Sequence, residues 1–201
     1  MGRVSAKKAM DTDAISMIVG LGNPGSSYAQ TRHNVGYRVA MRFSERHSIR
    51  LRRKRKLKSH VGVGEVAGKQ VVVVLPTTFM NRSGEAVASA VGFYGVHPKD
   101  VLVILDDVHL PLGRLRIRSK GSDGGHNGLR SVTAWLGTAD FPRLRVGVGR
   151  EESNSLTDFV LGGFSQEEKE VIDGAVERAV EAAKDVVADG VANAMNRYNP
   201  A

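Results

Sequence analysis

The sequence contains no cysteine, which excludes disulfide bonds, thiolate metal sites and a cysteine nucleophile. It also has no run of about 18 apolar residues, so we expect no membrane-spanning helix. Residues 1–14 lack the apolar stretch of a secretory signal, and we expect them to be a disordered extension or a tag remnant. Together these absences favour a protein of the reducing cytoplasm.

Acidic residues are outnumbered: 21 Asp and Glu stand against 29 Lys and Arg, for a formal net charge of +8. The basic residues gather in three clusters, at 50–58, 114–120 and 143–150. Any one cluster is compatible with an ordinary solvated surface. Three in one chain favour a nucleic-acid partner, because phosphate contacts supply most of the affinity of such complexes.

The length of 201 residues predicts one domain, over 15–198, with a substantial core. The apolar patterns predict strands at 15–20, 59–67, 70–75, 101–105, 114–119 and 143–148. They predict helices at 34–48, 83–94 and 129–136, and a long one after residue 165 that ends or kinks at Gly190.

This alternation predicts an α/β fold: a single three-layer αβα domain with a twisted mixed, mostly parallel sheet. The expected turns at Gly68-Lys69 and 111–113 introduce some antiparallel pairing. Ser165 to Glu168 form a capping-box pattern that opens the long helix. The apolar side of that helix is predicted to include Val171 and Ile172.

A glycine turn, Gly-Leu-Gly-Asn-Pro-Gly at 20–25, follows the first expected strand. With Thr-Arg-His-Asn at 31–34 it places an amide, Asn23, and an imidazole, His33, near the carboxyl end of a strand, where open α/β sheets hold ligands. The three glycines also fit the dinucleotide fingerprint, but the residues after Pro24 indicate a turn and Glu45 falls in a helical pattern. We therefore expect no nucleotide cofactor.

Further polar residues follow other expected strands. Asn81 comes after the strand at 70–75, Asp106 and Asp107 come after 101–105, and His126-Asn127 stand between 114–119 and the next helix. Each alone is compatible with a cap or a turn. Their joint placement indicates one polar site.

The residue types in this set favour acid–base chemistry. Histidine is the usual general base near neutral pH, and Asp106 or Asp107 could orient His33. Since no nucleophile-elbow serine pattern occurs, activated water is the simplest nucleophile. Zinc held by His33, Asp106 and His126 is the competing interpretation, but the usual ligand spacings are missing and we expect no metal. The residues predict hydrolysis of an ester or amide on a polyanionic carrier.

Five motifs occur in order over 15–198: G-L-G-N-P-G, Y-A-x-T-R-H-N, P-T-T-F-M-N-x-S-G, G-G-H-N-G-L-R-S and F-x-R-L-R-V-G-V-G. In these the chain resembles bacterial-type peptidyl-tRNA hydrolases. The resemblance implies a monomeric enzyme, without metal or cofactor, that hydrolyses the ester between a peptide and the 3′ end of tRNA. A catalytically silent RNA-binding or splicing-scaffold protein on the same fold is the alternative. The complete polar set favours the enzyme.

The resemblance implies a role for each motif residue. His33 corresponds to the catalytic base, Asp106 to the carboxylate that orients it, and Asn127 to a residue that positions the water or the carbonyl. Peptide contacts are implied for Asn23 and Asn81. The full implied substrate-binding set is Asn23, Tyr28, Phe79, Met80, Asn81, His126, Arg118 and Arg145, the last two as a clamp for the tRNA 5′-phosphate.

The chain departs from the family pattern at three places. His109 stands where an acid is usual, which we expect to alter the charge near the cleft. Residues 119–123 are less glycine-rich than usual, which we expect to alter the mobility of that loop. The cluster at 50–58 is unusually basic, and we expect it to add non-specific RNA affinity.

Overall fold

The computed structural model describes residues 15–149 and 155–200. The expected extension at 1–14 and Arg150 of the third basic cluster lie outside this part. The strands are β1 Met17–Gly20, β2 Arg52–Lys54, β3 Ser59–Val66, β4 Lys69–Pro76, β5 Val101–Asp107, β6 Leu115–Arg118 and β7 Arg143–Gly147. They form one seven-stranded sheet in the order β2-β3-β4-β1-β5-β7-β6.

The centre of the sheet is parallel and its edges are antiparallel. β1 pairs in parallel with β4 and β5, and β5 pairs in parallel with β7. β3 is antiparallel to β4 and β2, and β6 is antiparallel to β7. The expected mixed sheet is confirmed, and the carboxyl ends of β4, β1, β5 and β7 meet at one edge, where the polar motifs follow.

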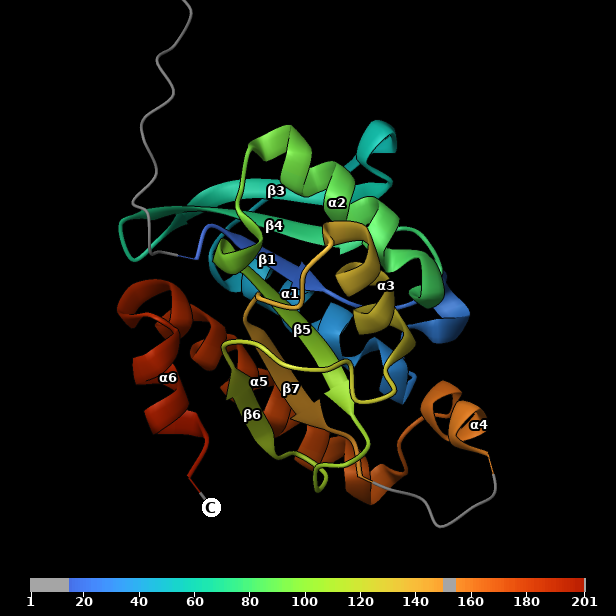
Figure 1. The fold of residues 1–201 in the computed structure, drawn as a ribbon. Coiled ribbons are helices and arrows are strands. Elements are labelled where there is room, and N and C mark those ends of the chain that lie inside the picture. The colour runs from blue at the N-terminus through green and yellow to red at the C-terminus, as the bar shows by residue number, and fades with distance from the viewer. Residues whose placement is uncertain (1–14, 150–154, 201) are drawn as a thin grey trace, which may run out of the picture.

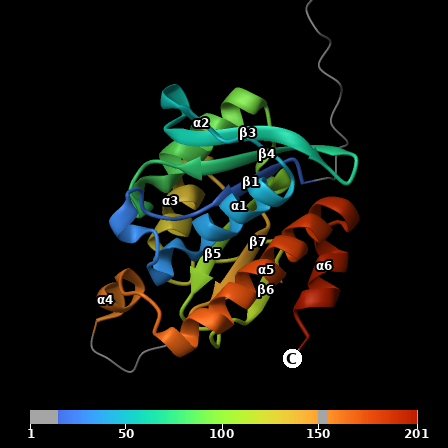
Figure 2. The same cartoon turned by 180° about the vertical axis from the view of Figure 1, so that it is seen from behind.

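Helices cover both faces of the sheet (Figures 1 and 2). They are α1 Val35–Arg46, α2 Ser83–Tyr94, α3 Asn127–Leu136, α4 Leu156–Leu161, α5 Gln166–Asp189 and α6 Val191–Tyr198. α2 and α3 lie on one face, and α1 and α5 on the other. No helix in the described ranges is both long and apolar enough to span a bilayer.

The alternation of side chains along β1 divides the core in two. Ile18 packs into the cluster that includes α1 and α5, whereas Met17 and Val19 pack into the cluster with α2 and α3. Because successive side chains of a strand point to opposite faces, a central strand must be apolar at every position. This is why β1, β4 and β5 are recognisable as continuous apolar runs.

The long helix confirms one sequence prediction and corrects another. Ser165 and Glu168 form the capping box at the start of α5, with Ser165 N donating to Glu168 Oε2 at 2.8 Å. Val171, predicted on the apolar side, is instead 46% exposed. It borders the turn at Gly113 rather than the sheet, and Ile172 begins the buried face.

The sequence patterns missed two short elements and one strand end. β2 lies within the basic cluster at 50–58 and all its residues are exposed, so it has no apolar alternation to reveal it. α4 is only six residues long. β5 extends through Asp106 and Asp107, which are therefore its last residues rather than its successors.

Candidate active site

A cavity of about 590 Å³ opens where the polar motifs meet. It lies at the carboxyl ends of β1, β4 and β5, between the glycine turn and the amino end of α3. Ten of the eleven residues predicted for the site line it: Asn23, Tyr28, His33, Phe79, Met80, Asn81, Asp106, His126, Asn127 and Arg145.

His33 is bonded to Asp106 in the wall of the cavity. It lies in a short 3-10 helix, Arg32–Asn34, between the glycine turn and α1. Its Nδ1 is 2.9 and 3.0 Å from the two carboxylate oxygens of Asp106. Because an ionised carboxylate only accepts hydrogen bonds, Nδ1 carries the proton. The lone pair of His33 is therefore on Nε2, which has no protein partner among the described residues and is free to take a proton.

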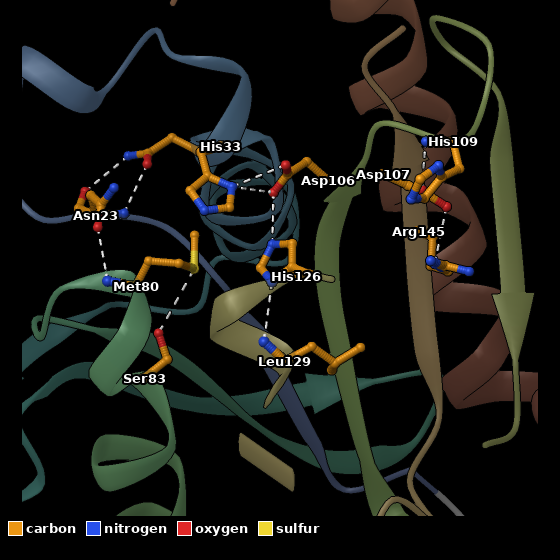
Figure 3. Close-up of polar contacts among 11 residues, drawn as sticks. Asn23, His33, Met80, Ser83, Asp106, Asp107, His109, His126, Leu129 and Arg145 are labelled. Atoms are coloured by element: carbon orange, nitrogen blue, oxygen red, sulfur yellow. Dashed lines mark hydrogen bonds and ion pairs between the residues drawn. The ribbon is translucent and has the colours of Figure 1, made fainter. Parts of the chain in front are cut away.

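His126, which caps the amino end of α3, contacts the same carboxylate but cannot act as a second base (Figure 3). Its Nε2 lies 2.9 Å from Asp106 Oδ1, while its Nδ1 accepts a hydrogen bond from Leu129 N at 3.1 Å. This pattern fixes the neutral tautomer with the proton on Nε2. The two imidazoles are thus distinguished by their partners: only His33 presents a free lone pair.

Burial and the two histidines act in opposite directions on Asp106. The side chain is buried, which on its own raises the pKa of a carboxyl. His126 and His33 outweigh this, and the pKa of Asp106 lies well below its usual range. The carboxylate is therefore ionised throughout the physiological range and stabilises positive charge on His33.

His33, Asp106 and His126 are also close enough to hold a divalent cation, with one ligand atom from each within 4.8 Å of the others. In the observed arrangement, however, both ring nitrogens that face Asp106 donate protons to it. A metal bound through these nitrogens would have to displace those protons. The geometry therefore favours a hydrogen-bonded triad.

Asn23 is held so that its amide nitrogen remains available. The Asn34 side chain bonds the Asn23 backbone twice, accepting from N at 2.8 Å and donating to O at 2.9 Å. Asn23 Oδ1 accepts from Met80 N at 2.8 Å (Figure 3). The Asn23 NH₂ group, which has no partner among the described residues, can therefore donate to a bound ligand. The clamp by Asn34 is a contribution that the sequence analysis did not assign.

The chain is similar to known proteins over nearly its whole length. The family model described as peptidyl-tRNA hydrolase matches residues 17–201. The chain belongs to this family. A peptidyl-tRNA hydrolase of Caldanaerobacter subterraneus subsp. tengcongensis is 49% identical over 91% of the chain and 98% of its own length, and one of Chloroflexus aggregans is 46% identical over 92% and 98%. The crystal structure of peptidyl-tRNA hydrolase from Acinetobacter baumannii superposes with a TM-score of 0.89 at 37% identity, covering 96% of this chain and 97% of that one.

Within this peptidyl-tRNA hydrolase fold, the two neighbouring aspartates have different partners. Asp107 Oδ1 accepts from His109 N at 2.9 Å, and Oδ2 lies 3.0 Å from Arg145 Nε, an ion pair without the angle of a hydrogen bond. Of the two aspartates, Asp106 is the one that contacts His33. The His109 side chain is exposed and does not line the cavity.

Other residues predicted for the site lie at the mouth of the cavity. Asn81 and Asn127 are exposed, and Asn127 Oδ1 accepts from Arg130 at 3.2 Å. Phe79 is 56% exposed and its ring meets that of Tyr28 edge-on, with centroids 6.4 Å apart. These side chains are placed to contact a ligand that enters from solvent.

Arg118 is the one predicted residue that does not line the cavity. It lies on β6, exposed, opposite Arg143 of β7. Arg143 is buried and donates to the carbonyl oxygens of Phe141 and Ala139, so it holds loops rather than ligand. Arg118 extends the basic surface beyond Arg145, outside the cavity itself.

The sequence analysis missed α4 as a wall of the cavity and the buried ion pair of Arg32 next to it. Leu156, Val160 and Leu161 of α4 form an apolar wall of the cavity. Arg32, next to His33, has its guanidinium between two phenylalanine rings and pairs with Glu168 at 2.8 and 3.1 Å. A buried arginine needs a fixed anionic partner, and Glu168 is that partner for Arg32. The Arg-His pair in the motif was the available sequence signal for this arginine.

Proposed function

We propose that the chain hydrolyses the ester between the peptide and the 3′ oxygen of tRNA, by means of water activated by His33. The observation that carries this proposal is the free Nε2 lone pair of His33, with Nδ1 bonded to the buried, ionised Asp106. Histidine held in this way takes a proton and has its positive charge stabilised.

The reaction proceeds in two proton transfers. His33 Nε2 removes a proton from water as the water oxygen attacks the ester carbonyl carbon. The tetrahedral intermediate then collapses, the bond to the 3′ oxygen breaks, and that oxygen takes the proton from the His33 imidazolium. The products are a peptide carboxylic acid, which ionises to the carboxylate by releasing its proton to solvent, and a tRNA with a free 3′ hydroxyl, and His33 is regenerated.

Asparagine amides in the site favour peptidyl esters over free aminoacyl esters. The free NH₂ of Asn23 and the exposed amide of Asn81 are placed to pair with the peptide group next to the ester, and Asn127 with the water or the carbonyl. A substrate without that peptide group leaves the buried Asn23 amide unpaired, which costs binding energy in the transition state. We expect N-acetylaminoacyl-tRNA to be hydrolysed much faster than free aminoacyl-tRNA.

Arg145 provides a basic contact for tRNA at the cavity. Its ion pair with Asp107 orients the guanidinium, and its fork suits a phosphate oxygen pair. Arg118, farther along the same basic surface, extends this contact as a clamp for the tRNA 5′-phosphate. The family resemblance supports a protein that acts as a monomer, and the absence of cysteine is compatible with the cytoplasm.

The direct test is release of N-acetylated amino acid from tRNA by the wild-type protein, with multiple turnovers and with a chelator present. We expect release with chelator and without it. Tight binding of the tRNA without release would support the RNA-binding scaffold instead. Activity that the chelator abolishes and Zn²⁺ restores would support the metal interpretation.

A further inference from the structure

A second, smaller cavity of about 330 Å³ adjoins the active-site cavity. Phe79 and Arg82 line both cavities, so the two share a wall. The other walls come from the basic segment at 50–58, the end of β4 and the first turn of α2. Its remaining lining residues are Arg53, Arg55, Lys58, Thr77, Thr78 and Glu85.

The backbone brings this basic segment to the edge of the active site. Thr77 N, just after β4, donates to Lys58 O at 2.8 Å, and Ser59 is paired with Pro76 in the β3–β4 ladder. Lys58 itself has a left-handed backbone, with φ at 47°, which is costly for a residue other than glycine. Since β4 is parallel to β1, its end lies at the same sheet edge as the glycine turn.

The cavity has more positive charge than its own residues neutralise. Among the described residues, Glu85 is the only acidic one that lines it, and it is paired with both Lys58 and Arg82, the latter at 3.0 Å. Arg53 and Arg55 are exposed and have no acidic partner in the described part of the chain. Two uncompensated guanidinium groups beside threonine hydroxyls are suited to a phosphate group.

One buried hydroxyl strengthens this assignment. Thr78 Oγ1 is buried and has no hydrogen-bond partner among the described residues. Buried polar groups are nearly always hydrogen-bonded, and exceptions in native structures call for an explanation such as a missing ligand or water. Thr78 lines this cavity, and rotation of its side chain would let the hydroxyl donate to a phosphate oxygen there.

We propose that this cavity binds the backbone phosphate of the nucleotide that carries the ester. The inference rests on the proposed function, which places the 3′ oxygen of that nucleotide beside His33. The 5′-phosphate of that nucleotide is then separated from the 3′ oxygen by a single ribose. The shared wall of Phe79 and Arg82 puts the second cavity next to the first. Arg145 lies on the other side of β1 in the sheet order and contacts a different part of the RNA.

An acidic residue of the peptide is the competing occupant. Every substrate has a phosphate at this fixed distance from the ester, whereas only some peptides carry an acidic side chain there. The backbone contact between Thr77 and Lys58 holds the basic segment at a fixed place beside the active site. Such a site suits the phosphate, which every substrate carries, better than an occasional acidic side chain. The two occupants predict different substrate dependence, which the experiment below separates.

The test compares two minimal substrates, the N-acetylphenylalanine 3′ ester of adenosine and the same ester of adenosine 5′-phosphate. For the wild type we expect the phosphate to lower KM. In the double variant Arg53→Gln, Arg55→Gln we expect the ratio of the two KM values to approach one. With tRNA as substrate, the slope of log KM against log salt should fall by about 0.7 for each phosphate contact removed.

Lys54→Gln is the matched control. It removes one positive charge from the same segment, against two in the double variant, but the Lys54 ammonium lies 5.8 Å from the Phe93 ring and does not line the cavity. We expect this variant to keep the wild-type KM ratio. A loss in Lys54→Gln equal to that of the double variant per charge removed would show that only net charge matters, and would overturn the proposal.

Four further results bear on the proposal. An unchanged KM ratio in the double variant overturns it, as does an effect confined to esters of acidic peptides. Competitive binding of adenosine 5′-phosphate and adenosine, measured without turnover, should show the same phosphate preference and the same loss. If the wild type bound with this preference but hydrolysed no ester, the proposed function would fail while the cavity assignment stood.

Discussion

Replacing Asp106 by asparagine tests the link between the hydrogen-bond geometry and the chemistry. The variant keeps the shape of the side chain but removes the charge that both histidines contact at 2.9 Å. Asparagine also offers an NH₂ group where His33 Nδ1 now donates, which favours the wrong tautomer and hides the lone pair. We expect kcat to fall by about 10²–10⁴-fold, or about 3–5 kcal/mol of transition-state stabilisation.

The assay is steady-state hydrolysis of N-acetylaminoacyl-tRNA, which gives kcat and KM, with tRNA affinity measured separately. Asp107→Asn is the matched control, because it makes the same change one residue along β5, where the carboxylate contacts Arg145 rather than His33. We expect that control to raise KM with little change in kcat. An Asp106→Asn protein that is folded and within tenfold of the wild-type kcat would refute the role given to the carboxylate.

Three other outcomes follow from the packing and the charges. Arg32→Met should lower the free energy of unfolding in urea by about 1–3 kcal/mol, because it removes the paired hydrogen bonds to Glu168; an unchanged midpoint would contradict this. Gly84→Ala should cost about 1–3 kcal/mol, since its methyl would lie 2.1 Å from Ser131 O between α2 and α3, and equal stability would show that the helices separate easily. The depressed pKa of Asp106 gives stability that is present above its ordinary pKa and lost as pH falls below about 4, so acid titration of the unfolding free energy should be shallower in Asp106→Asn.

The fold followed from the sequence where burial was complete on both faces. Val71 to Leu75 and Val101 to Leu105 are continuous apolar runs, and both are central strands. β2 was missed because its exposed Arg-Arg-Lys sequence is held by pairing with β3 rather than by burial. Val171 was misplaced because helical periodicity does not show where a helix extends past the sheet.

The site was predictable in its membership but not in its hydrogen bonds. Placement after successive strands brought His33, Asp106 and Asn127 to one cavity, as the topology requires. Residue type could not distinguish Asp106 from Asp107, since both are aspartates. Adjacent residues at the end of a strand point to opposite faces, and the sequence does not show which face His33 shares. Nor could the sequence show that the Nδ1 lone pair of His126 accepts a hydrogen bond from Leu129 N and is therefore not available as a base. That contact depends on where α3 begins.

The central claim is that His33 is the base, and His33→Gln tests it most directly. Glutamine keeps a polar side chain but has no lone pair of comparable basicity. The measurement is the single-turnover rate of N-acetylaminoacyl-tRNA hydrolysis at saturating protein, with tRNA affinity determined in parallel. We predict a loss of about 10²–10⁴-fold in rate with affinity within a few-fold of the wild type. A rate close to that of the wild type, with the fold intact, would place the base elsewhere and contradict the mechanism.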